Sequence, residues 1–265
     1  SSSLALLADA GHMLTDAAGL GLALLAAVFA GRPATPERTF GYLRAEILAA
    51  VLNAVLLIAV AVYVLVEAVR RLVEPPEIAH GLMLLVALVG LAANTASLLL
   101  LRPGSTESLN LRGAYLEVLG DLLGSAAVVV AALVIRFTGF LRADAVASAL
   151  IALLILPRTW RLLRDATDVL LEATPKGVDL AEVRDHMMAV PGVLDVHDLH
   201  AWTITSGVPV LSVHVVVEGA SLADAGGGPV LDQLGACLAD HFDVEHCTFQ
   251  LEPAGHREHE PDHHD

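Results

Sequence analysis

The first 165 residues alternate between long apolar stretches and short polar segments. Five apolar stretches, near residues 4–30, 46–69, 79–101, 112–137 and 143–163, have the length that an α-helix needs to cross about 30 Å of hydrocarbon. The segments between them contain helix-breaking residues such as Pro75-Pro76, Pro103-Gly104 and Thr138-Gly139. The pattern therefore predicts an α-helical membrane domain over residues 1–165.

Arginine is unevenly distributed among the gaps between these stretches. Eight arginines border the first, third and fifth gaps, and four border the second and fourth. By the positive-inside bias the first set is cytoplasmic, which also places the rest of the chain in the cytosol. Five spans are an odd number, so the first visible helix would start outside. Because the sequence also opens without Met, we expect that an N-terminal helix is missing.

The periodicity changes after Thr174-Pro175. Residues 178–190 and 229–242 have helical spacing, whereas residues 192–205, 208–219 and 247–252 alternate as strands do. The order α-β-β-α-β predicts a small α+β domain of ferredoxin-like type over residues 174–253, with two helices on one face of an antiparallel sheet. Residues 254–265 form a polar, histidine-rich tail that we expect to be disordered.

Composition supports this division. The chain is 55% hydrophobic with a mean hydropathy of +0.67, too apolar for an ordinary soluble globule. Residues 1–165 contain 12 Arg and 12 acidic residues, whereas residues 166–265 contain 18 acidic and three basic residues, so the net charge of −15 belongs to the second part. An acidic surface with ten of the 12 histidines suits divalent cations and disfavours nucleic acid. The two cysteines provide no disulfide framework.

Two predicted membrane helices carry pairs of ionisable residues. His12 and Asp16 are four residues apart, as are Glu117 and Asp121, so each pair lies on one helix face. Ionisable groups are costly inside a membrane and are usually retained for function. One imidazole and three carboxylates make a tetrahedral zinc site plausible. The alternative is a salt-bridge network or a set of helix-end groups, but neither helix offers a cationic partner at that depth.

Other polar residues in the predicted spans favour a structural interpretation. Asp9 is a weaker ligand candidate, and a position at the outer end or in helix packing is favoured for it. Asn53 and Asn94 are expected to form hydrogen bonds between helices rather than to touch the ion.

Four motifs, "SLALLADAGHMLTDAAGL", "TFGYLRAEILAAVLNAV", "NLRGAYLEVLGDLLGS" and "GVLDVHDLHAW", resemble the cation diffusion facilitator family, in particular the bacterial cobalt-zinc-cadmium resistance branch of its zinc transporters. The likeness runs from residue 1 to about residue 253. It implies a homodimer of six-helix protomers in the lipid of the bacterial inner membrane, each exchanging a cytoplasmic divalent metal for protons. This chain would begin inside the second helix.

The resemblance also implies metal ligands. His12, Asp16 and Asp121 match the transport site of zinc-type members, whereas most of those members have His in place of Glu117, which leaves zinc, cobalt and cadmium open. In the cytosolic domain, His197, His214 and Glu252 look like ligands of one regulatory zinc, with His200 and His246 less certain. The alternative is that these are surface histidines of an acidic domain. His186 and His241, on predicted helices, are expected to be ordinary surface residues. The tail histidines could bind metal loosely or could equally belong to a solvated tail: His256, His259, His263 and His264.

We therefore expect a divalent metal exporter, with zinc as the first candidate and cobalt or cadmium as others, working by metal/proton antiport. A membrane-anchored metal sensor is the main alternative, but a sensor has no need of ligands within two membrane helices. A metalloenzyme would need an open coordination position and a positioned base, and no H-E-x-x-H motif occurs.

Overall fold

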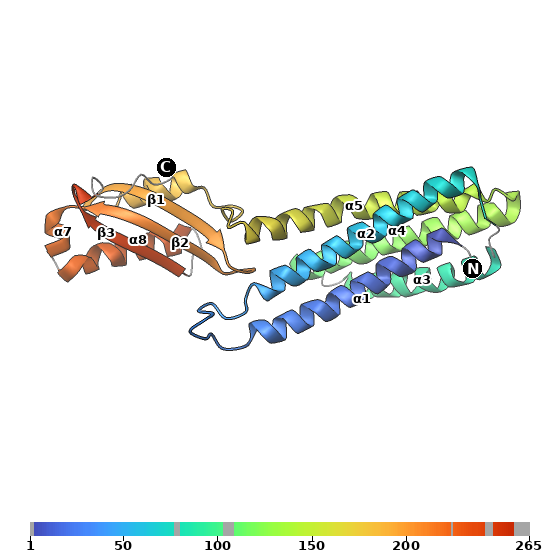
Figure 1. Cartoon of the computed structure of the whole chain (residues 1–265), viewed down its shortest axis with the longest axis horizontal. Coiled ribbons are helices and arrows are strands. Elements are labelled where there is room, and N and C mark those ends of the chain that lie inside the picture. The colour runs from blue at the N-terminus through green and yellow to red at the C-terminus, as the bar shows by residue number, and fades with distance from the viewer. Residues whose placement is uncertain (1–2, 77–79, 103–108, 224, 242–245, 257–265) are drawn as a thin grey trace. The chain divides into compact units, whose positions relative to one another are not determined.

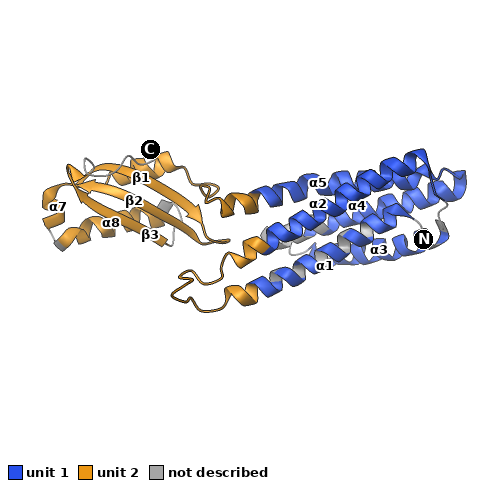
Figure 2. Ribbon diagram, viewed as in Figure 1, with its two compact units in different colours: residues 1–26, 49–164 blue, residues 27–48, 165–265 orange. Residues whose placement is uncertain are grey.

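A computed structural model describes residues 3–76, 80–102, 109–223, 225–241 and 246–256. Within the helices, the side chains of several residues, including His12, Asp16 and Glu117, lie outside the described set. The chain divides into two compact units, one of residues 1–26 and 49–164 and the other of residues 27–48 and 165–265 (Figure 2).

The first unit is built from five long helices that alternate in direction (Figure 1). They are α1 (Leu4–Ala30), α2 (Ala45–Val73), α3 (His80–Leu101), α4 (Leu109–Thr138) and α5 (Arg142–Leu170). Among the described residues, α2, α3, α4 and α5 each contain a stretch long and apolar enough to cross a membrane. The fifth helix extends past the predicted end at residue 163, because hydropathy marks the apolar part of a helix and not the point at which its hydrogen bonding stops.

The helices pack against one another largely through alanine, which lets backbones approach closely. Their large apolar side chains point outward instead: Leu14 is 72% exposed, Leu100 82% and Leu154 63%. Such a surface would be unfavourable in water and is suited to hydrocarbon. The two buried clusters consist of Ala5, Met83, Ala87, Val128, Ala131, Ala132, Ile135, Ala147 and Ile151, and of Leu4, Ala8, Ala61, Val64, Ala68 and Ala152.

The first turn of α1 is capped by a carboxylate from α5. Asp144 is completely buried and accepts hydrogen bonds from the backbone nitrogen of Leu4 at 2.7 Å and that of Ala5 at 3.1 Å. It also accepts one from the Ser3 hydroxyl at 2.5 Å, while Ser3 Oγ accepts from the nitrogen of Leu6. These groups satisfy N–H donors that have no partner within a helix. Asp144 thereby fixes the start of α1 to α5.

The second unit contains the α+β domain. Its elements are α6 (Leu180–Met188), β1 (Val193–Thr203), β2 (Pro209–Val217), α7 (Gly219–Ala223), a short 3-10 turn (Ala225–Gly227), α8 (Gly228–His241) and β3 (His246–Pro253). The sheet order is β1-β2-β3; β1 and β2 are antiparallel, whereas β2 and β3 are parallel. The predicted α+β class is correct, but the prediction of an antiparallel sheet is wrong for β3. The reason is that α8 returns the chain along the sheet before β3 begins, which makes β3 run in the direction of β2.

One face of this sheet packs on α6 and α8. The core includes Val213 and Val215 of β2, Val183 of α6 and Leu234 of α8, all completely buried. Side chains alternate across a strand, so the neighbouring residues of β2, among them His214, lie on the opposite face. Val213 and Val215 of β2 therefore face the core, and His214 between them faces the other side of the sheet.

The connection between α1 and α2 and the first residues of α2 belong to the second unit. Thr205, between β1 and β2, donates a hydrogen bond to Glu46 Oε2 at 2.8 Å, and Arg44 forms an ion pair with Glu172 at 2.8 Å. Both links join the start of α2 to the C-terminal part of the chain.

We predict that Asp144→Ala destabilises the folded protein by about 3 kcal/mol, because it leaves buried N–H donors of α1 without an acceptor. Thermal unfolding in detergent measures the effect. Asp165→Ala is the control, since Asp165 pairs with Lys176 at an exposed site where an ion pair contributes little. Equal melting temperatures for the two variants would contradict the capping role.

Candidate metal sites

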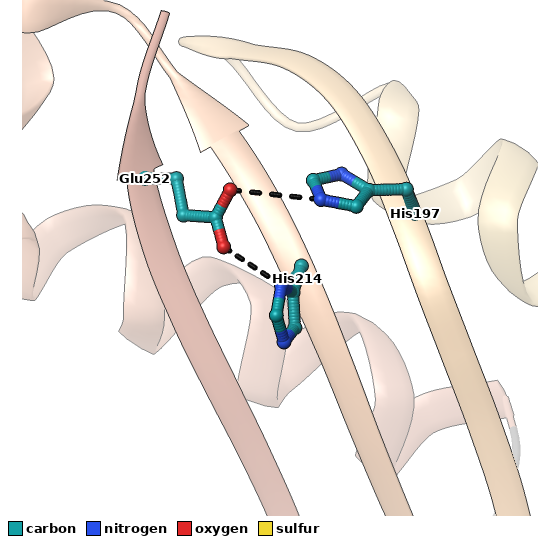
Figure 3. Close-up of side chains that lie close together, drawn as sticks. All are labelled: His197, His214 and Glu252. Atoms are coloured by element: carbon teal, nitrogen blue, oxygen red, sulfur yellow. Dashed lines mark ion pairs between the residues drawn. The ribbon is translucent and has the colours of Figure 1, made fainter. Parts of the chain in front are cut away.

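A cluster of potential metal ligands lies on the sheet face opposite the helices. His197 of β1 and His214 of β2 are register partners, and Glu252 comes from the end of β3, where its neighbour in the parallel register is Val216 (Figure 3). The three strands of the sheet thus each contribute one side chain.

The three side chains converge on a small volume. Glu252 Oε1 lies 2.7 Å from His214 Nδ1, and Glu252 Oε2 lies 3.6 Å from His197 Nε2. The imidazole rings are 5.2 Å apart, and one ligand atom from each residue falls within 4.8 Å of the others. Glu252 is 1% exposed and His197 8%. A buried carboxylate between two imidazoles is costly unless a proton or a cation neutralises it.

These ligand types and distances fit a zinc ion. In tetrahedral zinc sites the nitrogen and oxygen ligands lie about 2.1 Å from the metal and therefore about 3.4 Å from one another. The observed distances of 2.7 Å and 3.6 Å lie on either side of that value, and all three ligand atoms fall within 4.8 Å of one another. Within the described part of the chain, Glu252 Oε2 has no hydrogen-bond donor in range, so this oxygen is available to a cation.

A bulge in β1 adds a second carboxylate beside the cluster. The register with β2 shifts between His197 and His200, and Asp198 has a positive φ of 47°. This backbone conformation is uncommon for residues other than glycine. It turns Asp198 so that Oδ2 lies 3.7 Å from His214 Nε2 and Oδ1 lies 2.9 Å from His200 Nε2. Carboxylates in such positions commonly orient an imidazole ligand.

The less certain candidates fall outside the three-ligand group. His200 is paired with Asp198, and His246 lies at the start of β3 with its ring 6.2 Å from that of Phe40. His186 is half-buried on α6, with Nδ1 2.9 Å from the carbonyl oxygen of Glu182. The side chain of His241 and tail residues His259, His263 and His264 lie outside the described residues.

The cysteines do not join the metal ligands among the residues described. Cys247 lies between two exposed residues of β3, and its own side chain packs against the domain core. Burial raises the pKa of its thiol. A raised pKa disfavours the thiolate that binds metals, as expected for a small core residue.

In the membrane unit, both predicted ligand pairs lie on continuous helices. His12 and Asp16 are inside α1, and Glu117 and Asp121 are inside α4, although only Asp121 has a described side chain, which is half-buried. One turn beyond Asp121, Ser125 is bonded to Asn94 of α3 at 3.3 Å, which confirms the hydrogen bond between helices expected for Asn94.

Asn53 of α2 differs from this expectation. Its Oδ1 atom is buried, and no donor of the described residues lies within hydrogen-bonding distance of it. Among the described residues, this oxygen therefore does not form the hydrogen bond to another helix that was expected for Asn53. Sequence reasoning also missed Asp198, because only the bulge in β1 directs that carboxylate toward His214.

Comparison with known proteins places the chain in a family. Residues 1–171 match the Cation efflux transmembrane domain, and residues 175–254 match the Cation efflux protein, cytoplasmic domain. The chain is 51% identical over 252 residues to the Metal cation efflux system protein CzcD of Cupriavidus metallidurans, covering 95% of this chain and 79% of that protein. It is 46% identical to the Zinc transporter ZitB of Escherichia coli, covering 95% of this chain and 80% of that protein.

Two further matches extend this comparison. A Cadmium, cobalt and zinc/H(+)-K(+) antiporter of Bacillus velezensis is 41% identical, covering 96% of this chain and 82% of that protein. The metal-bound C-terminal domain of the CzcD transporter from Cupriavidus metallidurans is 48% identical, covers 28% of this chain and 99% of that one, and has a TM-score of 0.26, which is too low to bear on the arrangement of the chain.

The chain belongs to the cation efflux family, also called cation diffusion facilitators. It is a multi-pass membrane protein with a cytoplasmic C-terminal domain, and the family assignment predicted from the four motifs is confirmed.

We predict that zinc raises the melting temperature of residues 174–254 produced alone, because an ion that binds only the folded form stabilises it by mass action. At a zinc concentration 100 times the dissociation constant the gain is about 2.7 kcal/mol. His214→Ala should abolish most of this gain. His186→Ala is the matched control, because His186 lies on α6 outside the three-ligand group. An equal loss of stabilisation in both variants would show that the cluster does not bind zinc.

Proposed function

We propose that this chain exports zinc from the cytoplasm in exchange for protons, and that His12, Asp16, Glu117 and Asp121 bind the ion during transport. The observation that carries the proposal is the presence of two ligand pairs with the same spacing on two membrane helices. Each pair occupies one helix face because residues four apart are neighbours on a helix.

The levels of the two pairs along their helices support a shared site. Ala5 of α1 and Ala132 of α4 belong to one buried cluster, and these helices run in opposite directions. At 1.5 Å per residue, Asp16 lies about 16 Å along α1 from Ala5, and Asp121 lies about 16 Å along α4 from Ala132. Each aspartate thus lies the same distance along its helix from a residue of this one cluster, on the cytoplasmic side of it, as a shared site requires.

Coupling to protons follows from the chemistry of these ligands. Imidazole and carboxylate bind a metal only in their deprotonated forms, so protons and zinc compete for the same atoms. A site that opens alternately to the two sides of the membrane can then release zinc outward and take up protons. Metal bound at the site is the cargo, and its binding must be reversible on each cycle.

Glu117 bears on the choice of metal. A carboxylate is a harder ligand than the imidazole expected there, and it adds a negative charge. The names of the relatives include zinc, cobalt and cadmium. We therefore propose zinc as the principal substrate, with cobalt and cadmium as further substrates.

The cytosolic cluster is proposed as a regulatory zinc site formed by His197, His214 and Glu252. The match to the family's cytoplasmic domain supports assembly as a homodimer. Because the C-terminal part of the chain is strongly acidic, two copies repel one another, and bound zinc reduces that repulsion. Metal binding would thus favour the dimer. The sensor alternative is not favoured, because the described relatives are named as efflux proteins and transporters.

We predict that Asp16→Ala and Asp121→Ala each abolish zinc transport while the protein remains folded, because each removes a ligand and little apolar area. Zinc flux into proteoliposomes under a pH gradient measures transport, and size-exclusion chromatography of the same samples measures folding. Asp232→Ala, an exposed carboxylate on α8, should retain normal flux. Normal flux in Asp16→Ala or Asp121→Ala would refute the four-ligand site.

We predict that Glu117→His retains zinc transport and weakens competition by cobalt and cadmium, because imidazole replaces a charged oxygen ligand. Inhibition of zinc uptake by each competing ion is the measurement, with the Asp232→Ala protein as reference. If the competition profiles of Glu117→His and the reference are the same, position 117 does not contact the ion.

A further inference from the structure

The ligand face of α1 continues one turn beyond Asp16. Residues 12, 16 and 19 follow the spacing of four and three that keeps side chains on one face of a helix. The third of these is Gly19, which lies about 4.5 Å farther along the axis from Asp16. This end of α1 leads into residues 27–48, which share a unit with the cytoplasmic domain. Position 19 therefore lies on the cytoplasmic side of the proposed transport site.

The side chain of Asn53 occupies the space that a residue larger than glycine would take at position 19. A Cβ atom added to Gly19 would lie 2.5 Å from Asn53 Nδ2 and 2.6 Å from both Cγ and Oδ1. Real Cβ atoms do not approach heavy atoms so closely. An alanine at position 19 would displace the amide, so the glycine permits α2 to place a polar group on the ligand face of α1.

Burial without a partner distinguishes this amide from the other asparagine of the bundle. Asn94 Nδ2 donates a hydrogen bond to Ser125 Oγ, which joins α3 to α4. Asn53 Oδ1 is buried and, over the described residues, has no hydrogen-bond donor in range. Leaving an amide oxygen in this state costs about 1–3 kcal/mol, a penalty that a bound cation would remove.

We propose that Asn53 Oδ1 is an oxygen ligand on the cytoplasmic path of the ion, which receives zinc before it reaches Asp16 and Asp121. The proposal deepens the function proposed above and rests on it. Amide oxygens coordinate divalent cations, but a neutral amide binds zinc more weakly than carboxylate and imidazole do. A transit site must bind well enough to admit the ion and weakly enough to release it. A neutral amide such as that of Asn53 meets both requirements, whereas a fourth carboxylate would bind the ion too tightly to release it.

The test is zinc transport in proteoliposomes, with separate determination of KM for zinc on the cytoplasmic side and of the maximal rate. Asn53→Ala should raise KM about tenfold while equilibrium zinc binding to the detergent-solubilised protein stays unchanged, because the four principal ligands remain. Asn53→Asp, which keeps an oxygen at this position, should restore KM to within about twofold. It should also lower the maximal rate, because the charged ligand releases zinc more slowly.

Gly19→Ala provides a second variant that leaves Asn53 in the chain but displaces its amide. It should raise KM as Asn53→Ala does, and combining the two changes should add little. Asn94→Ala is the matched control for removal of a buried amide, and its KM should stay near that of the unmodified protein. An unchanged KM in Asn53→Ala, or an equal rise in Asn94→Ala, would overturn the proposal.

Asp121→Ala in the same experiment separates this proposal from the one on which it rests. If Asp121→Ala transports zinc normally, the four-ligand site itself is wrong. If Asp121→Ala is inactive and Asn53→Ala has the normal KM, the site stands and the role of Asn53 is refuted.

Discussion

The energetic cost of polar groups in hydrocarbon is the constraint on which the membrane part of this protein depends. The helices present leucine and valine outward and meet one another through alanine, so their contacts come from close approach and not from expulsion of water. Every polar side chain that remains inside must then find a partner in the bundle or an ion. The positions of Asp144, Asn94 and Asn53 are three responses to this requirement.

Asp144 and Asn94 satisfy the constraint within the protein. The carboxylate of Asp144 accepts the first N–H groups of α1 and ties that helix to α5, and the amide of Asn94 joins α3 to α4 next to the turn that carries Asp121. Both helices proposed to hold the ion are thus fixed to a neighbour by a buried hydrogen bond. Asn53 stands apart, because its buried oxygen faces a glycine and has no described donor within reach. The contrast suggests that structural and transport roles are divided among the polar residues of the bundle.

In the cytosolic domain, one face of the sheet forms the hydrophobic core and the other carries the candidate metal ligands. Valines on alternate positions of β2 form the core against α6 and α8, and the intervening positions carry His214 and its neighbours. Parallel pairing of β3 with β2 then brings Glu252 beside both histidines. The cluster is nearly closed to solvent, so the carboxylate and imidazoles are held ready for a cation that neutralises them. Zinc binding at this proposed site would link the metal content of the cytoplasm to the stability of the domain.

The sequence by itself determined the membrane class, the positions of the five long helices, the order of elements in the cytosolic domain and the family. These features depend on hydropathy, periodicity and local motifs, which are properties of neighbouring residues. The spacing of His12 with Asp16 and of Glu117 with Asp121 was equally visible, because a helix brings residues four apart to one face.

Tertiary structure decided what depends on residues distant in the chain. The parallel pairing of β3, the bulge that turns Asp198 toward His214, the capping of α1 by Asp144 and the contact of Asn53 with Gly19 each join separate segments. None has a local signal, since the same residues would give the same periodicity with other partners. Local pattern thus specified the elements and most candidate ligands, and packing alone selected which of their side chains meet.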